Sequence, residues 1–327
     1  MNEKNSDLNP VEKPKEKNFS LRPKSIDEFI GQAHIKNNLK TFIKSSEKRK
    51  KSLDHIILYG PPGLGKTTLA NIISLEKRVN IHATSGPAFT KKGDLVTLLS
   101  NLSLGDILFI DEIHRLSPII EETLYPAMED FKCDYIIGSG PSARVMQISI
   151  DQFTLIGATT RLGLLSRPLR DRFGIQLQLG FYEPTDIKNI IELNARKLKV
   201  LIESDASLEI AKRSRGTPRI AIRLMNRIID FSIVQNKSKI DLNLVIDSLE
   251  KMRIDSEGLD DMDRKYLKCI LENYNGGPVG IETLSAALLE QRDIIEDVIE
   301  PYLMQRGLVQ RTSRGRILSK KGLNHIE

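Results

Sequence analysis

A glycine-rich loop in the first third of the chain could hold the phosphates of a nucleotide. It matches the pattern GxxxxGK[ST], follows an apolar strand-like segment and precedes a helical one, which is the context that the pattern requires. Such glycines let backbone N–H groups close around phosphate oxygens, the lysine reaches the outer phosphates, and the hydroxyl binds Mg²⁺. The residues that we expect to do this are Gly63, Gly65, Lys66, Thr67 and Thr68. The loop therefore predicts a site for ATP or GTP.

Two adjacent carboxylates end another apolar segment further along the chain. Asp111 lies 45 residues after Lys66, and Glu112 follows it directly. An acidic strand end is more often a solvated surface. Beside a phosphate-binding loop, however, Asp111 could hold Mg²⁺ and Glu112 could activate the attacking water. Paired carboxylates also favour hydrolysis over phosphoryl transfer to another molecule.

A third apolar segment ends near Thr159, and two arginines follow it closely. Thr159 could sense the γ-phosphate or position the water, but an ordinary strand-end cap would have the same sequence. Arg170 and Arg172 stand near the start of a short helix. An arginine at a subunit edge can stabilise transition-state charge in a neighbouring site. From the residues alone, surface ion pairing is the more common role of such a pair.

The arrangement of these segments predicts an α/β fold. Nearly continuous apolar runs, of which 56–59, 107–110 and 153–156 are the clearest, alternate with helical stretches. This pattern is typical of a parallel sheet with helices on both faces. Further along, apolar residues recur with a helical period and without a clear strand, and the final segment combines helices with a short hairpin. We predict a flexible tail at 1–18, an α/β nucleotide-binding domain at 19–182, a small all-helical domain at 183–255 and a C-terminal domain at 256–327.

Composition excludes several classes of protein. Cys133 and Cys269 are far apart, and the five histidines lack metal-ligand spacing, so we expect no structural zinc and no disulfide framework. No apolar run is long enough to span a bilayer, and the N-terminus does not resemble a signal peptide, so we expect a soluble cytoplasmic protein. The 49 basic and 43 acidic residues give a net charge of +6, which permits nucleic-acid binding without requiring it.

Basic residues concentrate near the C-terminus. Residues 302–321 contain six arginines and lysines and no acidic residue, whereas the segment just before them is acidic. Two helices, the second kinked by Pro301, and two short strands predict a winged helix whose wing lies along phosphates. A basic hairpin is often only a solvated surface. Because aromatic residues make up only 5% of the chain, contacts to the duplex DNA backbone fit better than stacking on single strands.

The segment 132–152 predicts a further hairpin, with a Gly-Pro turn and several apolar residues. These residues are Ile136, Ile137, Val145, Ile148 and Ile150. Apolar residues of a hairpin usually belong to the core. If they are exposed, they form the kind of surface that a protein interface needs.

Together these features resemble the RuvB family of AAA+ ATPases, the motors of Holliday junction branch migration. The resemblance extends from residue 21 to residue 316 and rests on short runs in the family's order and spacing, at 21–24, 54–55, 84–87, 111–116, 125–131, 157–161 and 215–219. It implies an AAA+ ATPase domain with a parallel sheet, a small helical lid domain and a C-terminal winged-helix head. The chain departs from the family pattern at Lys92, Arg167 and Ile222, none of which is a catalytic group.

The resemblance also implies roles for individual residues. Thr159 matches sensor 1, Arg219 matches the sensor 2 arginine, and Arg170 matches the arginine finger given to the adjacent subunit, which reverses the expectation from the residues alone. Further nucleotide contacts are implied for Leu21, Arg22, Glu129, Asp130, Phe131, Arg172 and Tyr182. DNA contacts are implied for Arg292, Arg311 and Arg316. The apolar hairpin is implied as the docking site of the junction-binding protein RuvA.

The predicted function is therefore an ATP- and Mg²⁺-dependent motor that pulls duplex DNA and moves Holliday junctions in recombination and DNA repair, including the SOS response to DNA damage. The resemblance implies a homo-oligomeric ring, expected to be a hexamer on DNA, that acts with RuvA and the resolvase RuvC. The alternative is an ATP-controlled switch of the clamp-loader type, but such relatives lack the C-terminal winged unit. A protein unfoldase would need an aromatic pore loop, and Phe89 is the one aromatic residue between Gly86 and Asp94.

Overall fold

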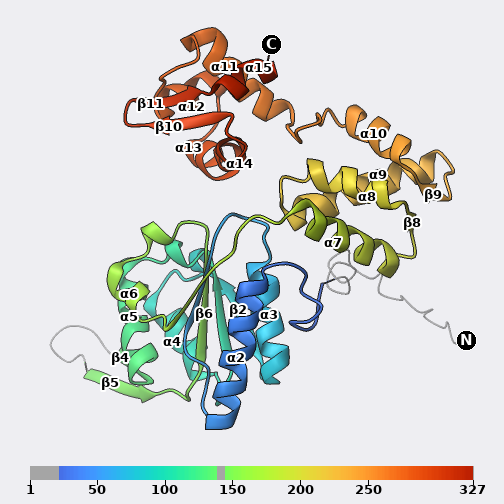
Figure 1. The fold of residues 1–327 in the computed structure, drawn as a ribbon. Helices are drawn as coiled ribbons and strands as arrows, with labels where there is room; N and C mark the ends of the chain where they lie inside the picture. Colours follow the sequence, from blue (N-terminus) through green and yellow to red (C-terminus); the bar gives the residue numbers. More distant parts are fainter. Residues whose placement is uncertain (1–21, 138–143, 327) are drawn as a thin grey trace, which may run out of the picture.

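The computed structural model describes residues 22–137 and 144–326, which form three units along the chain (Figure 1). The first unit contains the β-sheet, the second is a group of helices, and the third, at the C-terminal end, combines helices with a two-stranded hairpin. Within the described residues, no helix has both the length and the apolar character needed to cross a membrane. The same residues contain no cluster of three or more side chains suited to a metal ion. The predicted tail at 1–18 lies outside the described residues.

Among the described residues, five parallel strands form the sheet of the first unit. Their order is β2-β3-β6-β1-β7. Ile56 pairs with Ile156 on one side and with Ile175 on the other, both in parallel register. The strands are β1 (Ile56–Tyr59), β2 (Ile81–Ser85), β3 (Ile107–Asp111), β6 (Thr154–Thr159) and β7 (Ile175–Gln178). Parallel strands end at the same edge, so the ends of β1, β3 and β6 bring the predicted site residues together.

Alternation along the strands divides the core into two layers. Ile56 and Leu58 belong to the hydrophobic cluster on one face of the sheet, and Ile57 belongs to the cluster on the other. All three are fully buried, which is why the strand is continuously apolar rather than alternating. As Figure 1 shows, one face is covered by α2 (Ala33–Arg49) and α3 (Lys66–Lys77), and the other by α4 (Lys92–Ser100) and α5 (Pro118–Glu129).

Shorter elements extend from the second face. Strands β4 (Lys132–Ile137) and β5 (Arg144–Ser149) form an antiparallel hairpin after α5. The short helix α6 (Arg167–Asp171) is capped by Ser166, whose hydroxyl oxygen accepts a hydrogen bond from the Leu169 N–H at 3.3 Å. Short 3-10 turns connect the larger elements at η1 (Gly86–Ala88), η2 (Ile113–Arg115) and η4 (Leu162–Leu164).

The second unit is a bundle of helices that shares a core with the sheet. Its helices are α7 (Pro184–Lys197), α8 (Ser204–Arg213), α9 (Pro218–Val234) and α10 (Leu242–Lys251). Ile191 and Leu224 of this bundle belong to the same hydrophobic cluster as Leu69 and Ile156 of the first unit. The expectation of an all-helical unit needs one correction, because β8 (Leu201–Ile202) and β9 (Lys239–Ile240) form a two-residue parallel ladder. Strands this short leave no alternating pattern in the sequence.

The third unit has a hydrophobic cluster of its own and the predicted winged-helix elements. They are α11 (Asp261–Tyr274), α12 (Ile281–Leu288), α13 (Arg292–Ile294), the π-helical turn η5 (Ile295–Ile299), α14 (Glu300–Gln305), β10 (Val309–Thr312), β11 (Gly315–Leu318) and α15 (Lys320–Ile326). The hairpin of β10 and β11 is the wing. The π-helical turn ends at Ile299, two residues before Pro301, where a regular helix would bring the proline ring against an earlier carbonyl group.

Candidate nucleotide and DNA sites

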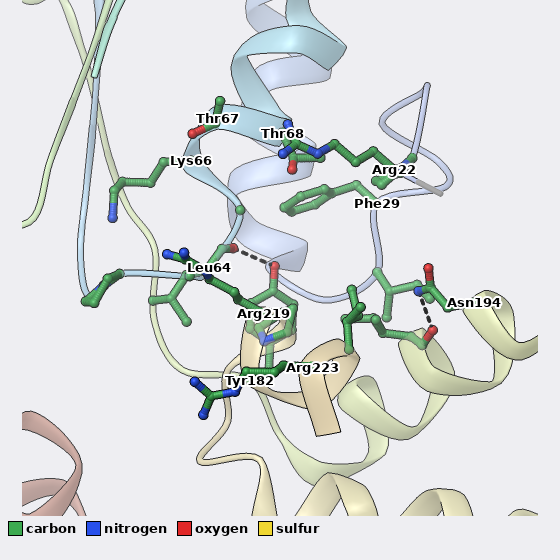
Figure 2. A pocket seen from close by; sticks show the side chains of 18 of the residues that line it. Arg22, Phe29, Leu64, Lys66, Thr67, Thr68, Tyr182, Asn194, Arg219 and Arg223 are labelled. Carbon is green, nitrogen blue, oxygen red and sulfur yellow. Dashed lines mark hydrogen bonds between the residues drawn. The ribbon is translucent and has the colours of Figure 1, made fainter. Parts of the chain in front are cut away.

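A cavity of about 670 Å³ lies between the sheet domain and the helical bundle, at the ends of β1 and β3 (Figure 2). Its size suits a nucleotide. The residues predicted from the sequence that line it are Arg22, Gly63, Gly65, Lys66, Thr67, Thr68, Asp111, Glu112, Tyr182 and Arg219. Leu21, also predicted there, lies outside the described residues. The structure thus brings together side chains that are spread over nearly two hundred residues of the chain.

Lys66 is the first residue of α3 and is held inside the phosphate loop. Its Nζ atom donates hydrogen bonds to the carbonyl oxygens of Gly60 at 2.7 Å and Pro61 at 2.8 Å, and the residue is only 8% exposed. Burial lowers the pKa of Lys66 to about 8, although the nearby carboxylates of Asp111 and Glu112 act in the opposite direction. Phosphate oxygens in the cavity would favour its charged form.

Gly63 allows the helical bundle to approach the phosphate loop. Its φ angle is +79°, and a side chain here would meet Thr217 Cγ2 at 2.8 Å and Arg219 Cβ at 3.0 Å. The Arg219 N–H donates to the Gly63 carbonyl oxygen at 3.4 Å, just after α9 begins at Pro218. The absence of a side chain therefore lets Arg219 reach the cavity from the second unit.

The two carboxylates lie at the carboxyl end of β3. Asp111 Oδ2 accepts a hydrogen bond from the Thr67 hydroxyl at 3.5 Å, and Asp111 Oδ1 accepts one from the Glu112 N–H at 3.0 Å. Glu112 has a left-handed backbone with a φ angle of +51°, which turns the chain sharply after the strand. Gly86 makes this turn possible, because a side chain there would come within 2.5 Å of the Glu112 carbonyl oxygen.

Thr159, the last residue of β6, is connected to Glu112 through a histidine. Thr159 is 1% exposed, and its Oγ1 atom lies 2.9 Å from His114 Nδ1. His114 Nε2 in turn lies 3.7 Å from Glu112 Oε2. Thr160 lines the cavity directly. Sequence reasoning missed His114, whose position two residues after Glu112 was the available signal.

Tyr182 connects the sheet domain to the helical bundle. Its hydroxyl donates to the Leu64 carbonyl oxygen at 3.1 Å (Figure 2). Its N–H donates to the Gly216 carbonyl oxygen at 2.9 Å. Burial raises the pKa of the Tyr182 hydroxyl, so that it remains a hydrogen-bond donor. The residue expected at the base and ribose side of the nucleotide also fixes the contact between the two units.

Several lining residues were not predicted from the sequence. Figure 2 shows Phe29, Asn194 and Arg223 facing the same space as the phosphate loop. The remaining unpredicted lining residues include Ile190, Leu193, Ile222, Asn226 and Arg227. On α9 the spacing from Arg219 to 222, 223 and 226 marks one helix face, a signal that could have found them. Ile222, where the chain departs from the family pattern, thus lines the cavity, whereas Lys92 and Arg167 begin α4 and α6.

A second group of predicted nucleotide-site residues gathers elsewhere, around α5 and α6. Arg172 Nη2 lies 3.1 Å from Glu129 Oε2, and its guanidinium carbon lies 4.4 Å from the centre of the Tyr125 ring. Arg172 Nε is buried and has no hydrogen-bond partner among the described residues. Arg170 lies on the same short helix.

These residues do not line the cavity of their own chain. Glu129, Asp130, Phe131, Arg170 and Arg172 are absent from the described residues that surround it. Phe131 instead packs into the core of the second face, with its ring centre 6.2 Å from that of Phe153. The structure therefore does not place Glu129, Asp130, Phe131 or Arg172 against the cavity of their own chain, and Arg170, predicted to act on the adjacent subunit, lies with them.

The predicted DNA-binding arginines surround one carboxylate, that of Glu296. Arg292 and Arg311 are 51% and 54% exposed, and they lie 3.0 Å and 3.3 Å from it. Arg316 is only 5% exposed and lies 2.9 Å from Glu296 and 2.8 Å from Glu300. Arg311 and Arg292 are thus placed at the surface as expected. Arg316 is not, because it is buried in ion pairs that hold the wing to α14.

The apolar hairpin differs in part from the expected docking surface. Ile150 is 7% exposed and belongs to the core of the second face, and Ile148 packs partly against it. The assignment of Ile150 to an exposed interface is therefore corrected, whereas Ile148 is only partly buried. Met146, which the sequence reading overlooked, is 47% exposed on β5. The side chains of Ile136, Ile137 and Val145 lie outside the described part of the structure.

Comparison with known proteins identifies the family. Residues 21–179 match the model described as "Holliday junction DNA helicase RuvB P-loop domain", residues 182–255 the RuvB AAA lid domain, and residues 256–327 the RuvB C-terminal winged helix domain. The chain is 53% identical over 319 residues to the Holliday junction branch migration complex subunit RuvB of Paramagnetospirillum magneticum, covering 98% of this chain and 92% of that protein. It is 54% identical over 307 residues to the protein of the same name from Rhodospirillum centenum, covering 94% and 85%.

A solved structure gives the same result. The Thermotoga maritima RuvB Holliday junction branch migration motor superposes with a TM-score of 0.87 and 51% identity, covering 94% of this chain and 98% of that one. The likeness therefore includes the sheet domain, the lid and the winged-helix head together. The chain belongs to the RuvB family, the AAA+ ATPase motors of Holliday junction branch migration.

Proposed function

We propose that the chain hydrolyses ATP in the cavity between the sheet domain and the lid, and that it drives branch migration as one subunit of a ring. The observation that supports this most directly is the convergence of Lys66, Glu112 and Arg219 on one cavity. Lys66 and Arg219 approach from different units, so a bound triphosphate would bridge the sheet domain and the lid. Loss of the outer phosphate would weaken that bridge and let the lid move.

Thr67 and Asp111 would hold Mg²⁺. Their side-chain oxygens lie 3.5 Å apart and line the cavity beside the phosphate loop. Mg²⁺ prefers oxygen ligands and is usually held by one or two protein groups together with phosphates and water. The donor set therefore fits the ion, which supplies charge neutralisation on the phosphates when bound.

Glu112 would act as the general base. Its carboxylate lies at the edge of the cavity and can accept the proton of the attacking water. His114 and Thr159 would hold Glu112 and the water in position, because they connect it to the end of β6. Lys66 and Arg219 would stabilise the charge that develops on the transferred phosphoryl group.

Arg170 and Arg172 would complete the site of the adjacent subunit. Their position around α5 and α6, away from their own cavity, supports a role between subunits. The buried and unpartnered Nε atom of Arg172 is a donor that an incoming phosphate could satisfy. A closed ring, which we expect to be a hexamer on DNA, would place each such group against a neighbouring phosphate loop.

The winged-helix head would contact the DNA backbone through Arg292 and Arg311, and the hairpin of β4 and β5 would receive RuvA. We further propose a cytoplasmic role in recombination and in the DNA-damage response, with RuvC resolving the junction. These assignments rest on the family match and on the placement of the exposed arginines.

The test measures ATP hydrolysis against added duplex DNA, with and without RuvA, together with movement of a labelled four-way junction. Stimulated hydrolysis with junction movement is the expected result. Stimulation without movement would instead favour an ATP-controlled switch.

Two variants assign the subunit roles. Lys66→Ala should abolish nucleotide binding, and Arg170→Ala should retain binding but lose ring-dependent hydrolysis. A mixture of the two proteins should recover part of the activity if Arg170 acts on its neighbour. Failure of every mixing ratio to recover activity would contradict the shared site.

A further inference from the structure

Arg161 connects the end of the central strand β6 to the winged-helix head, although its partners lie more than 130 residues further along the chain. Its Nε atom donates to Asp297 Oδ1 at 2.8 Å, and its Nη2 atom lies 2.9 Å from Asp293 Oδ1 and 2.6 Å from Asp297 Oδ2. The planar guanidinium therefore binds both carboxylates at once, in the two-pronged arrangement that gives arginine pairs their geometric specificity. We call these three residues the clasp.

The clasp is continuous with the catalytic edge of the ATPase site. The Arg161 N–H donates to Thr159 Oγ1 at 3.0 Å, and the same oxygen lies 2.9 Å from His114 Nδ1. His114 then lies 3.7 Å from the Glu112 carboxylate. Thr159 is 1% exposed and the His114 side chain 8% exposed, so water competes little with the contact between them, whereas the Glu112 side chain is 42% exposed.

The other end of the clasp lies on the segment that carries a predicted DNA contact. Asp293 and Asp297 are four residues apart on α13 and η5. Arg292 and Glu296, each one residue earlier in the chain, form a second pair with the same spacing. The first pair binds Arg161, whereas Glu296 binds Arg292 and both wing arginines. One short helical segment therefore contacts the ATPase domain through Asp293 and Asp297 and the wing through Glu296.

We propose that Arg161 is a positioning residue that couples the geometry at Glu112 to the orientation of the winged-helix head. A shift of Thr159 on nucleotide turnover would move the Arg161 backbone, which is bonded to it, and would strain or open the clasp. By reciprocity, a load on the head would be passed through the clasp to the histidine that contacts Glu112. The inference rests on the proposed ATP-driven function and adds the path by which DNA engagement and hydrolysis affect each other.

The experiment compares the full-length protein with Arg161→Ala, Arg161→Lys and the double variant Asp293→Asn/Asp297→Asn. The measured quantity is the ratio of DNA-stimulated to basal kcat, with KM for ATP and the Kd for duplex DNA determined in parallel. We expect Asp293→Asn/Asp297→Asn to retain basal kcat, KM and DNA affinity within about twofold while losing at least fivefold of the stimulation ratio. Arg161→Ala should lose the ratio equally, Arg161→Lys should recover part of it, and combining the aspartate changes with Arg161→Ala should cause no further loss.

Glu290→Gln serves as the matched control, because it removes an acidic charge from the same region of the head outside the clasp. It should retain the stimulation ratio. If the aspartate variant also retains it, the coupling role is overturned, whatever Arg161→Ala does to the site itself. If Arg161→Ala fails to fold, the aspartate variant alone decides, since Asp293 is 72% exposed and is not part of a core. A wild-type protein without DNA-stimulated hydrolysis would instead contradict the proposed function.

Discussion

The Thr67 hydroxyl oxygen lies 3.5 Å from Asp111 Oδ2, although 44 residues separate them in the chain. Thr67 lies in the first turn of α3 after the phosphate loop, and Asp111 ends β3. The parallel sheet brings them together because β1 and β3 both end at the same edge, with only β6 between them. The proposed Mg²⁺ ligands are therefore positioned by the fold and not by a local motif.

Asp111→Asn should retain Mg²⁺-independent nucleotide binding but lower kcat by about a hundredfold or more, since one metal-binding charge is lost. Thr67→Ser, which keeps the hydroxyl, should remain close to wild type. Titrations of ATP binding and turnover against Mg²⁺ concentration distinguish the two. An Asp111→Asn protein with unchanged Mg²⁺ dependence would refute the assignment.

Arg311→Ala and Arg316→Ala should have different consequences even though the residues pair across the wing. Arg316 neutralises Glu300, which is 1% exposed and also accepts a hydrogen bond from the Tyr266 hydroxyl at 2.9 Å. Removing Arg316 leaves that carboxylate buried and should cost about 3–5 kcal/mol of head stability. Arg311→Ala should cost less than about 1 kcal/mol but weaken DNA binding and flatten its salt dependence. Thermal unfolding combined with DNA titrations at several salt concentrations checks both statements.

Glu296→Gln should strengthen DNA binding. The change removes a carboxylate that is bound to Arg292, Arg311 and Arg316, and so frees the two exposed arginines for phosphate. Release of a pair worth about 1 kcal/mol corresponds to a roughly fivefold gain in affinity at low salt. Glu282→Gln, whose carboxylate contacts Arg292, is the control and should have a smaller effect. Weaker DNA binding by Glu296→Gln would show that this carboxylate orients the arginines rather than competing with DNA.

Asp263 should make stability depend on pH. Burial raises its pKa from 3.8 to about 6, despite the nearby Arg215 guanidinium. A raised pKa means that the folded protein holds this proton more tightly than the unfolded chain. The resulting stability is present below about pH 3.8 and is lost as the pH rises through about 6, a change of about 3 kcal/mol. Asp263→Asn does not titrate, so the stability of wild type relative to this variant should fall between pH 4 and 7 in calorimetric scans.

The sequence predicted the phosphate loop, the carboxylates after β3 and the parallel sheet because each is encoded by neighbouring residues. The partners of charged side chains were not predictable in the same way. The family resemblance implied a DNA contact for Arg316, but its partner Glu300 lies on a preceding helix and faces it only in the folded head. Arg172 and Glu129 are likewise 43 residues apart and meet only through the packing of α5 against α6.

The lid residues were missed for a related reason. Asn194 and Arg223 lie on one face of α7 and α9, and that face becomes part of the site only when the lid docks on the phosphate loop. A helical pattern shows which side of a helix is apolar but not which other unit it faces.

The hydrophobic cluster that covers one face of the sheet continues into the lid, whereas the winged-helix head has a separate cluster around Tyr266. Cooperative unfolding follows shared burial, since neither part of a common core can be exposed without exposing the other. Heating the protein should therefore give two calorimetric transitions rather than three, with the ATPase domain and lid melting as one unit. The lid would then move during turnover while it remains part of one stable folding unit with the ATPase domain. The head could dissociate from DNA and unfold while the ATPase domain and lid stay folded.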